Sequence, residues 1–412
     1  AGALAAVGSA FSLMTFLTSI LLGLAMGSGT VFSIRFGQKD HIGLKEGILA
    51  SFTLLGIVTI ILNIVVFVGI DWIIWILRTP ADLVVMMREY LIVIFAGLVG
   101  IFLYNFFASL LRSLGNSVVP LLFLAVSAIL NIVLDLWFVA GLNRGVSGAA
   151  EATVISQYVS GIGIAIYTWI KFPELLRKDK EVHFRMSRVK EITSYSALTC
   201  LQQSIMNLGI LAVQGLVNSF GTTVMAAFAA AVKIDAFAYL PVQDFGNAFS
   251  IFTAQNYGAK QTKRIQKGIR IAVLTSMVFS LFVSICVFIF AKPLMTLFID
   301  AEQTAVIAEG VRYLHIEGAF YFLIGALFLL YGLYRALGKP GMSVVLTIVS
   351  LGIRVALAYA LSAIPVLGVV GIWWSVPIGW FLADAFGIIY YFVKRKILLK
   401  GSGEDGSLAA DQ

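Results

Sequence analysis

Asn131 and Asp135 are the residues whose types and spacing most clearly indicate chemistry. They lie in the 23-residue apolar stretch 118–140, where Asp135 is the only charge. About 20 apolar residues suffice for a helix that crosses the hydrocarbon core of a membrane, and a spacing of four places both side chains on one helix face. A carboxylate at membrane depth costs at least about 2.5–3.5 kcal/mol and usually faces a bundle interior or an aqueous cavity. The pair is therefore the first candidate site; a single structural hydrogen bond to a neighbouring helix is the alternative.

The composition indicates an integral membrane protein. Apolar residues make up 60% of the 412 residues and charged residues 12%, whereas soluble chains average about 45–50% and about 25%. The net charge of +8 does not indicate a nucleic-acid partner, because 27 of the 29 Lys and Arg residues lie in loops, tails or helix ends. Cys200 and Cys286 stand singly in apolar runs, which indicates neither a disulfide framework nor a metal site.

Eleven apolar runs are long enough to form membrane-spanning helices. They cover residues 3–34, 46–70, 89–111, 117–140, 146–170, 192–219, 222–255, 268–299, 309–334, 341–362 and 366–393. Alternate loops between them carry 22 Lys and Arg residues, and the opposite set carries five. The positive-inside rule therefore predicts that the first set of loops is cytoplasmic, together with the C-terminus. An odd number of spans then places the N-terminus outside.

The chain repeats itself with an offset of 221–223 residues. Phe36-Gly37 matches 257–258, Tyr90-Leu91 matches 313–314, 111–115 matches 334–338, and 145–148 matches 368–371. Matching loops fall on the same side, so we expect an all-α fold of two six-helix lobes related by a pseudo-twofold axis along the membrane normal. The predicted parts are an N-lobe at 1–170, a cytoplasmic linker at 171–191, a C-lobe at 192–395 and a polar cytoplasmic tail at 396–412. The counterpart of helix 192–219 would precede residue 1, so we expect the N-lobe to hold five helices and to lack its first.

The sequence resembles multidrug and toxic compound extrusion (MATE) transporters of the bacterial, DinF-like kind over about residues 1–395. The similar stretches are RSLGN at 112–116 followed by Pro120, NIVLD at 131–135, GVSGAAEATVISQ at 145–157, QQS at 202–204 and AQNYGA at 254–259. The resemblance implies two six-helix lobes around a central cavity. It also implies drug export driven by the re-entry of Na⁺ or H⁺.

The same resemblance implies a cation or proton site inside the N-lobe, formed by Asp135, Asn131 and Thr153, with Asn105 as an amide on the preceding helix. The family's other essential Asp lies on the first helix, which would precede residue 1, and Glu151 stands where an apolar residue is usual. Carboxylate, amide and hydroxyl oxygens from Asp135, Asn131 and Thr153 suit a hard cation such as Na⁺. The desolvated carboxylate can equally load a proton, and the sequence does not separate these two loads.

Further charged residues lie inside apolar runs of the second half. They form a possible C-lobe polar network of Lys233, Asp235, Asp244, Glu317, Arg354 and Asp384. By the repeat, Arg354 occupies the place of Asn131, where it would repel a cation, so we expect no second equivalent cation site. We expect Arg354 to pair with one of the acids instead.

These features predict a secondary antiporter that exports amphipathic, mostly cationic compounds in exchange for Na⁺ or H⁺. Buried acids outnumber buried bases, and aromatic residues, 13% of the chain, offer cation–π surfaces. A flippase for lipid-linked anionic precursors, from the same exporter superfamily, is the alternative, but it needs several basic residues at membrane depth, and only Lys233 and Arg354 qualify.

A membrane enzyme or receptor is a third possibility. We expect no enzymatic activity, because the sequence contains no nucleophile–base pair, zinc-protease motif or phosphate-binding loop. We also expect no cofactor and no nucleic-acid partner. The predicted state is a monomer in the bilayer of a bacterial inner membrane.

Overall fold

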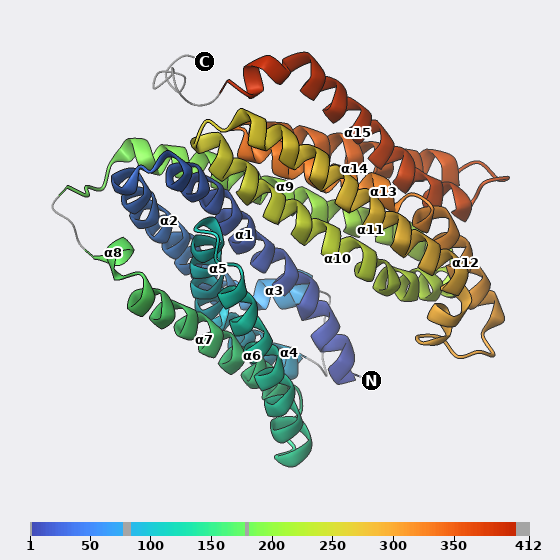
Figure 1. The fold of residues 1–412 in the computed structure, drawn as a ribbon. Coiled ribbons are helices and arrows are strands. Elements are labelled where there is room, and N and C mark those ends of the chain that lie inside the picture. The colour runs from blue at the N-terminus through green and yellow to red at the C-terminus, as the bar shows by residue number, and fades with distance from the viewer. Residues whose placement is uncertain (1, 77–83, 178–180, 401–412) are drawn as a thin grey trace. The chain divides into compact units, whose positions relative to one another are not determined.

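The computed structural model describes residues 2–76, 84–177 and 181–400, and in these ranges every regular element is a helix. The predicted tail beyond residue 400 and residues 178–180 of the predicted linker lie outside the described residues. In chain order the helices (Figure 1) are α1 (Gly2–Gln38), α2 (His41–Val68), α3 (Ile70–Ile76), α4 (Val84–Ala96), α5 (Leu98–Ser113), α6 (Val118–Asp135), the π-helix η2 (Leu136–Gly141), α7 (Gly145–Lys171), α8 (Pro173–Leu176), α9 (Met186–Asn218), α10 (Thr222–Gly258), α11 (Thr262–Thr296), α12 (Thr304–Gly318), α13 (Tyr321–Ala336), α14 (Pro340–Ser362) and α15 (Val369–Leu398).

The described chain has ten helical segments long and apolar enough to cross a membrane, and the bent pair α12–α13 makes an eleventh. This confirms the predicted all-α, multi-span fold. The predicted span 309–334 falls on the helix pair α12–α13, which is bent by 51°. At the bend the Phe320 N–H donates to Glu317 O, three residues back, at 2.9 Å. That short bond replaces the i→i−4 ladder, so the helix axis changes direction there.

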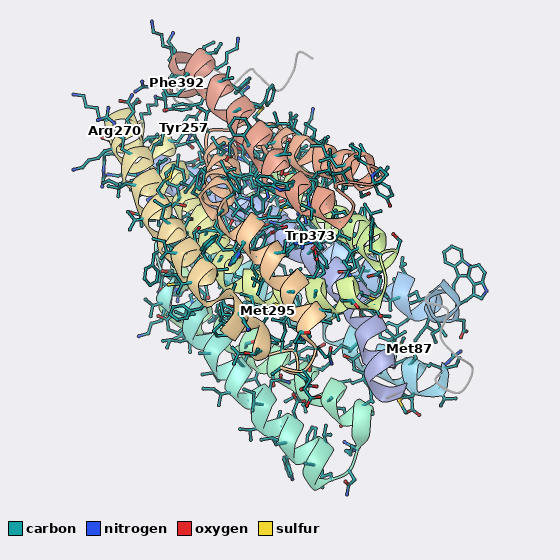
Figure 2. All side chains as sticks on the ribbon, turned by 90° about the vertical axis from the view of Figure 1, so that its right-hand side faces the viewer. Met87, Tyr257, Arg270, Met295, Trp373 and Phe392 are labelled. Carbon is teal, nitrogen blue, oxygen red and sulfur yellow. The ribbon has the colours of Figure 1, made fainter. Side chains whose placement is uncertain are left out.

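Many large apolar side chains point away from the protein. Ile132 is 60% exposed, Phe282 64% and Phe392 67%, and Figure 2 shows Phe392 at the outer surface of α15. Contiguous apolar surface of this kind is rare on proteins surrounded by water. It is expected where lipid covers the helices.

The internal repeat is visible in the helix bounds. Adding 223 to the bounds of α5 gives those of α13, and the helix before each of them ends just short of it. The same offset relates two pairs of turn glycines with positive φ, Gly115 (+89°) with Gly338 (+78°) and Gly145 (+59°) with Gly368 (+48°). Left-handed backbone is open to glycine, which has no Cβ to clash. These anchors therefore recur in the sequence because both halves contain the same turns.

The chain divides into two compact units, residues 1–203 and 204–412, and the division falls inside α9. Unit 1 contains α1 to α8 and the first half of α9. Unit 2 contains the second half of α9 and α10 to α15. The segment 171–191, predicted as the linker, holds α8 and the beginning of α9.

In unit 1, α1 packs directly against the first half of α9. A Cβ on Gly23 would lie 2.6 Å from Cys200 Cα, and one on Gly27 would lie 2.5 Å from Ser196 Cα, so the small residues allow backbone contact. Ser28 Oγ and Ser196 Oγ are hydrogen-bonded at 2.9 Å across the same interface. The contact depends on glycine at both positions because any larger side chain would push the helices apart.

An ionic cluster ties the ends of α1, α2 and α9 together in unit 1. Arg35 donates to both carboxylate oxygens of Glu191 at 2.6 and 2.8 Å. Glu46, only 2% exposed, forms ion pairs with Arg188 at 3.2 Å and Arg185 at 3.0 Å. Such fork-shaped guanidinium contacts fix orientation as well as charge.

The core of unit 2 is aromatic. The Trp373 ring, labelled in Figure 2, stacks on Phe228 with ring centroids 5.6 Å apart and meets the ring of Tyr313 edge-on at 4.9 Å. The Trp373 indole N–H donates to Glu309 Oε1 at 2.8 Å. These contacts join α10, α12 and α15, and they fix the position of Tyr313, which carries part of the site described next.

Candidate functional site

Three of the predicted coupling residues, Asp135, Asn131 and Thr153, lie where α6 packs against α7 in unit 1. Asn131 Nδ2 on α6 donates to Thr153 Oγ1 on α7 at 3.4 Å, and Thr153 donates to Ala149 O at 3.0 Å. Asp135 ends α6, one turn after Asn131, and the backbone continues as the π-helix η2. Such π-helical turns are rare and are frequently found at functional sites.

The Asp135 side chain is half-buried, and its Oδ1 is buried without a hydrogen-bond partner among the described residues. Tyr90 on α4 lies close enough to interact electrostatically with this carboxylate. Gln157 Oε1, one turn after Thr153, is also buried without a described partner, beside Gly97 at the break between α4 and α5. Because buried polar oxygens are normally satisfied, each of these two atoms is a buried acceptor that the described residues leave open.

The other two residues discussed from the sequence have local partners. The Asn105 amide donates to Ile101 O within α5 at 2.9 Å, so the structure assigns it no bond to the Asn131–Thr153 pair. Glu151 forms an ion pair with Arg144. Sequence reasoning did not single out Gln157, although its spacing of four from Thr153 places it on the same face of α7.

The donor set around Asp135 fits a small hard cation. Asp135 supplies a carboxylate, Asn131 an amide and Thr153 a hydroxyl, and hard cations prefer such oxygen ligands. In the described part of the chain, no group of three or more His, Cys, Asp and Glu side chains could hold a metal ion. A cation here would therefore depend on one carboxylate and on neutral oxygens.

Unit 2 contains a cavity of ≈ 220 Å³ lined by residues of α9, α10, α12, α13, α14 and α15. Three residues of the predicted C-lobe network line it: Asp235, Glu317 and Arg354. Most of the remaining wall is apolar or aromatic, and its rings belong to Phe228, Tyr239, Tyr313, Tyr321, Tyr331 and Trp380. A mostly apolar, aromatic wall with a few convergent charges is the usual design of a small-molecule site.

Two tyrosines hold Asp235. The Tyr313 hydroxyl donates to Asp235 Oδ2 at 2.5 Å, and the Tyr321 hydroxyl donates to Oδ1. Tyr313 lies on α12 and Tyr321 begins α13, so the two phenols reach one carboxylate from opposite sides of the bend. The repeat did not indicate this contact, because Tyr313 is the counterpart of Tyr90 whereas the counterpart of Asp135 is Ala358 and not Asp235. The sequence offered no indication for Tyr321 either.

Glu317 and Arg354 face the same cavity, and each has one buried atom without a described hydrogen-bond partner, although the Glu317 carboxyl group also interacts with Tyr313 and Asp235. Glu317 is 3% exposed, and its Oε1 has no hydrogen-bond partner among the described residues. Arg354 Nε is likewise buried and unpartnered there, although the guanidinium acts electrostatically on Asp235 and Glu317 at longer range. The predicted ion pair between Arg354 and an acid is therefore not among the contacts of the described residues.

The remaining residues of the predicted C-lobe network lie elsewhere. Lys233 is exposed, with Nζ 5.5 Å from the centre of the Phe298 ring, and Asp244 is also exposed. Asp384 on α15 is 3% exposed, and neither of its carboxylate oxygens has a described hydrogen-bond partner. Asp384 interacts electrostatically with Tyr331, which lines the cavity, but Asp384 itself is not a lining residue. It therefore lies behind the residues that form the cavity wall.

Comparisons with known proteins agree with this architecture. Residues 1–137 and 199–360 match the MatE family. The chain is 29% identical over 399 residues to the probable multidrug resistance protein YpnP of Bacillus subtilis (strain 168), covering 95% of this chain and 87% of that protein. It is 28% identical over 407 residues to the probable multidrug resistance protein YoeA of the same organism, covering 96% and 87%. A solved structure described as the outward-facing conformation of a multidrug resistance MATE family transporter of the MOP superfamily has a TM-score of 0.89 and 24% identity, covering 96% of this chain and 89% of that chain.

Proposed function

Because the chain belongs to the MatE family of multidrug and toxic compound extrusion transporters, we propose that it is a secondary antiporter that exports amphipathic, mostly cationic compounds in exchange for Na⁺ or H⁺. The relatives named as probable multidrug resistance proteins support a small-molecule substrate. The apolar helices support a multi-pass membrane protein. The distribution of Lys and Arg supports a C-terminus in the cytoplasm. The bacterial relatives support a place in the plasma membrane of a bacterium, where we propose a monomer.

The observation that carries the coupling proposal is the buried, unpartnered Oδ1 of Asp135. A bound cation or proton satisfies this oxygen and cancels the charge. The Asn131 amide nitrogen is turned to Thr153, which leaves its carbonyl oxygen as an acceptor toward the ion. Coupling then requires that the loaded and unloaded carboxylate favour different conformations of the transporter, because a ligand shifts an equilibrium only through differential affinity.

The test is ion-driven efflux of a fluorescent organic cation from proteoliposomes, with Na⁺ and pH gradients imposed separately. Asp135→Asn should abolish gradient-driven efflux while the unfolding temperature stays near that of the wild type. Asn131→Ala and Thr153→Ala should reduce it less, because neutral oxygens bind a cation more weakly than a charge does.

A matched control is Glu151→Gln, which removes a carboxylate two residues from Thr153 that is already paired with Arg144. It should transport like the wild type. Asp135→Asn protein that still couples efflux to either gradient would remove Asp135 from the mechanism.

The flippase alternative has one observation in its favour, the basic Arg354 in the wall of the unit 2 cavity. A single guanidinium opposite Asp235 and Glu317 gives little attraction for a lipid-linked diphosphate. Competition decides between the two functions. If lipid phosphates alone displace a bound fluorescent probe, the flippase function replaces the antiporter function.

A further inference from the structure

We propose that a basic surface at one end of unit 2, here called the basic patch, binds an anionic phospholipid of the bilayer. The patch consists of six exposed side chains from the beginning of α11 and the end of α15: Lys263, Arg264, Lys267, Arg270, Lys396 and Lys400. The two segments are in contact, because the Thr262 hydroxyl donates to Leu399 O at 3.2 Å. Figure 2 shows Arg270 on α11 and Phe392 on α15 at this end of unit 2.

The basic patch has no balancing negative charge beside it. Residues 245–299 and 385–403 contain neither Asp nor Glu. Among the described residues, none of the six side chains forms a hydrogen bond or an ion pair. Clusters of four to eight Lys and Arg next to a membrane-spanning helix are the pattern that attracts anionic lipid headgroups.

The position of the charges on α11 is unfavourable for the helix itself. Lys263 and Arg264 lie in its first turn, which contains no acidic residue, and the partial positive charge of a helix N-terminus disfavours cations there. Lys267 lies four residues after Lys263 and three before Arg270, so like charges also repel along one face. A bound anion relieves both repulsions.

The internal repeat separates the basic patch from the general excess of Lys and Arg in the loops. Helix α2 begins at residue 41 and α11 at residue 262, an offset of 221. At this offset the buried Glu46 corresponds to Lys267, and Leu49, 43% exposed, corresponds to Arg270. The positive-inside rule predicts basic loops in both halves, but it does not predict this difference between two matching helices.

The surroundings of the patch favour a lipid over a soluble anion. Large apolar side chains next to it point outward: Ile271 is 54% exposed and Leu274 66% on α11, and Phe392 is 67% and Ile397 66% on α15. Arg270 directly precedes Ile271, and an Arg side chain can lay its stem along apolar surface while its charge reaches the headgroups. A phospholipid presents its phosphate to the basic patch and its acyl chains to these apolar side chains, whereas a soluble anion meets the charges alone.

The experiment counts bound lipids by native mass spectrometry on the purified full-length protein in a nonionic detergent. The probes are phosphatidylglycerol and phosphatidylcholine with identical acyl chains. Wild-type protein should bind the first phosphatidylglycerol at least about tenfold more tightly than phosphatidylcholine, because each basic residue near a membrane surface contributes about a fivefold change in affinity. Arg270→Gln should therefore weaken phosphatidylglycerol binding about fivefold, and Lys267→Gln combined with Arg270→Gln about 25-fold.

Two single substitutions serve as matched controls. Lys292→Gln removes an exposed charge at the other end of α11, and Arg270→Lys keeps the charge of the patch; both should bind phosphatidylglycerol like the wild type. Without lipid, the variant with Lys267→Gln and Arg270→Gln should unfold at or above the wild-type temperature, because a repulsion is removed and no ion pair is lost. Weaker lipid binding then cannot be explained by misfolding.

Three results would overturn the proposal. The first is equal affinity of the wild type for both lipids, or full phosphatidylglycerol binding by the variant with both substitutions. The second is displacement of phosphatidylglycerol by an equal concentration of glycerol phosphate, since the patch would then bind any phosphate. The third concerns the acidic residues of the tail: if Glu404→Gln with Asp405→Asn tightens phosphatidylglycerol binding about tenfold, the tail and not a lipid is the partner of the patch.

Discussion

Gly115 gives the most direct test of how the repeat is built. It lies in the turn between α5 and α6 with φ of +89°, and no atom lies within 4 Å of a Cβ placed on it. Gly115→Ala therefore changes the backbone preference without any steric clash. Left-handed backbone costs a residue with a Cβ about 1–2 kcal/mol, so the free energy of unfolding should fall by that amount. For a cooperative unit of about 150–250 residues, this lowers the unfolding temperature by about 2–8 °C.

The matched control has the opposite expected sign. Gly352 lies inside α14 without a positive φ, and its added Cβ would meet only Ile348 Cγ2 at 3.9 Å. Alanine is the better helix former by about 0.8–1.0 kcal/mol, so Gly352→Ala should raise the unfolding temperature slightly. Gly338→Ala, at the repeat counterpart with φ of +78°, should behave like Gly115→Ala.

The assay is thermal unfolding of the full-length protein in one detergent, followed by tryptophan fluorescence. If Gly115→Ala unfolds at or above the wild-type temperature while Gly352→Ala behaves as expected, the left-handed conformation assigned to this turn is wrong. The explanation of why these glycines recur at a constant offset would then fail with it.

Two further substitutions test the buried charges by the same assay. Glu46→Gln should destabilise unit 1 by about 1–2 kcal/mol, because the charge paired with Arg188 is lost; solvent screens much of the pairing with Arg185, whose side chain is 56% exposed. The exposed Glu89→Gln should have no effect, and equal unfolding temperatures for the two variants would contradict a structural role for Glu46. Asp384→Val should stabilise unit 2 by about 1–3 kcal/mol, since a buried carboxyl group with no described partner is replaced by an apolar side chain; a lower unfolding temperature would mean that Asp384 has a partner that stabilises the fold.

The sequence alone determined the helices and their repetition. A run of apolar residues long enough to cross a bilayer as a helix can be recognised from its own residues. For this reason the eleven predicted spans agree with the membrane-spanning helical segments of the structure. The recurring glycines could be recognised for a similar reason, since a left-handed turn depends on its own residue and hardly on the rest of the chain. A spacing of four likewise placed Asn131 and Asp135 on one face of α6 without any knowledge of its neighbours.

Only the tertiary structure decided which side chains meet. The 51° bend between α12 and α13 brings Tyr313 and Tyr321 to the same carboxylate of Asp235, and neither a bend angle nor a helix rotation can be derived from residue spacing. Six charges inside apolar runs predicted one polar network, whereas the structure gathers three at a cavity and leaves the others elsewhere. Arg354 has no ion pair among the described residues because pairing depends on packing between helices. The sequence shows that a charge lies in an apolar run and that its burial is costly. Only the fold determines which partner group compensates that charge.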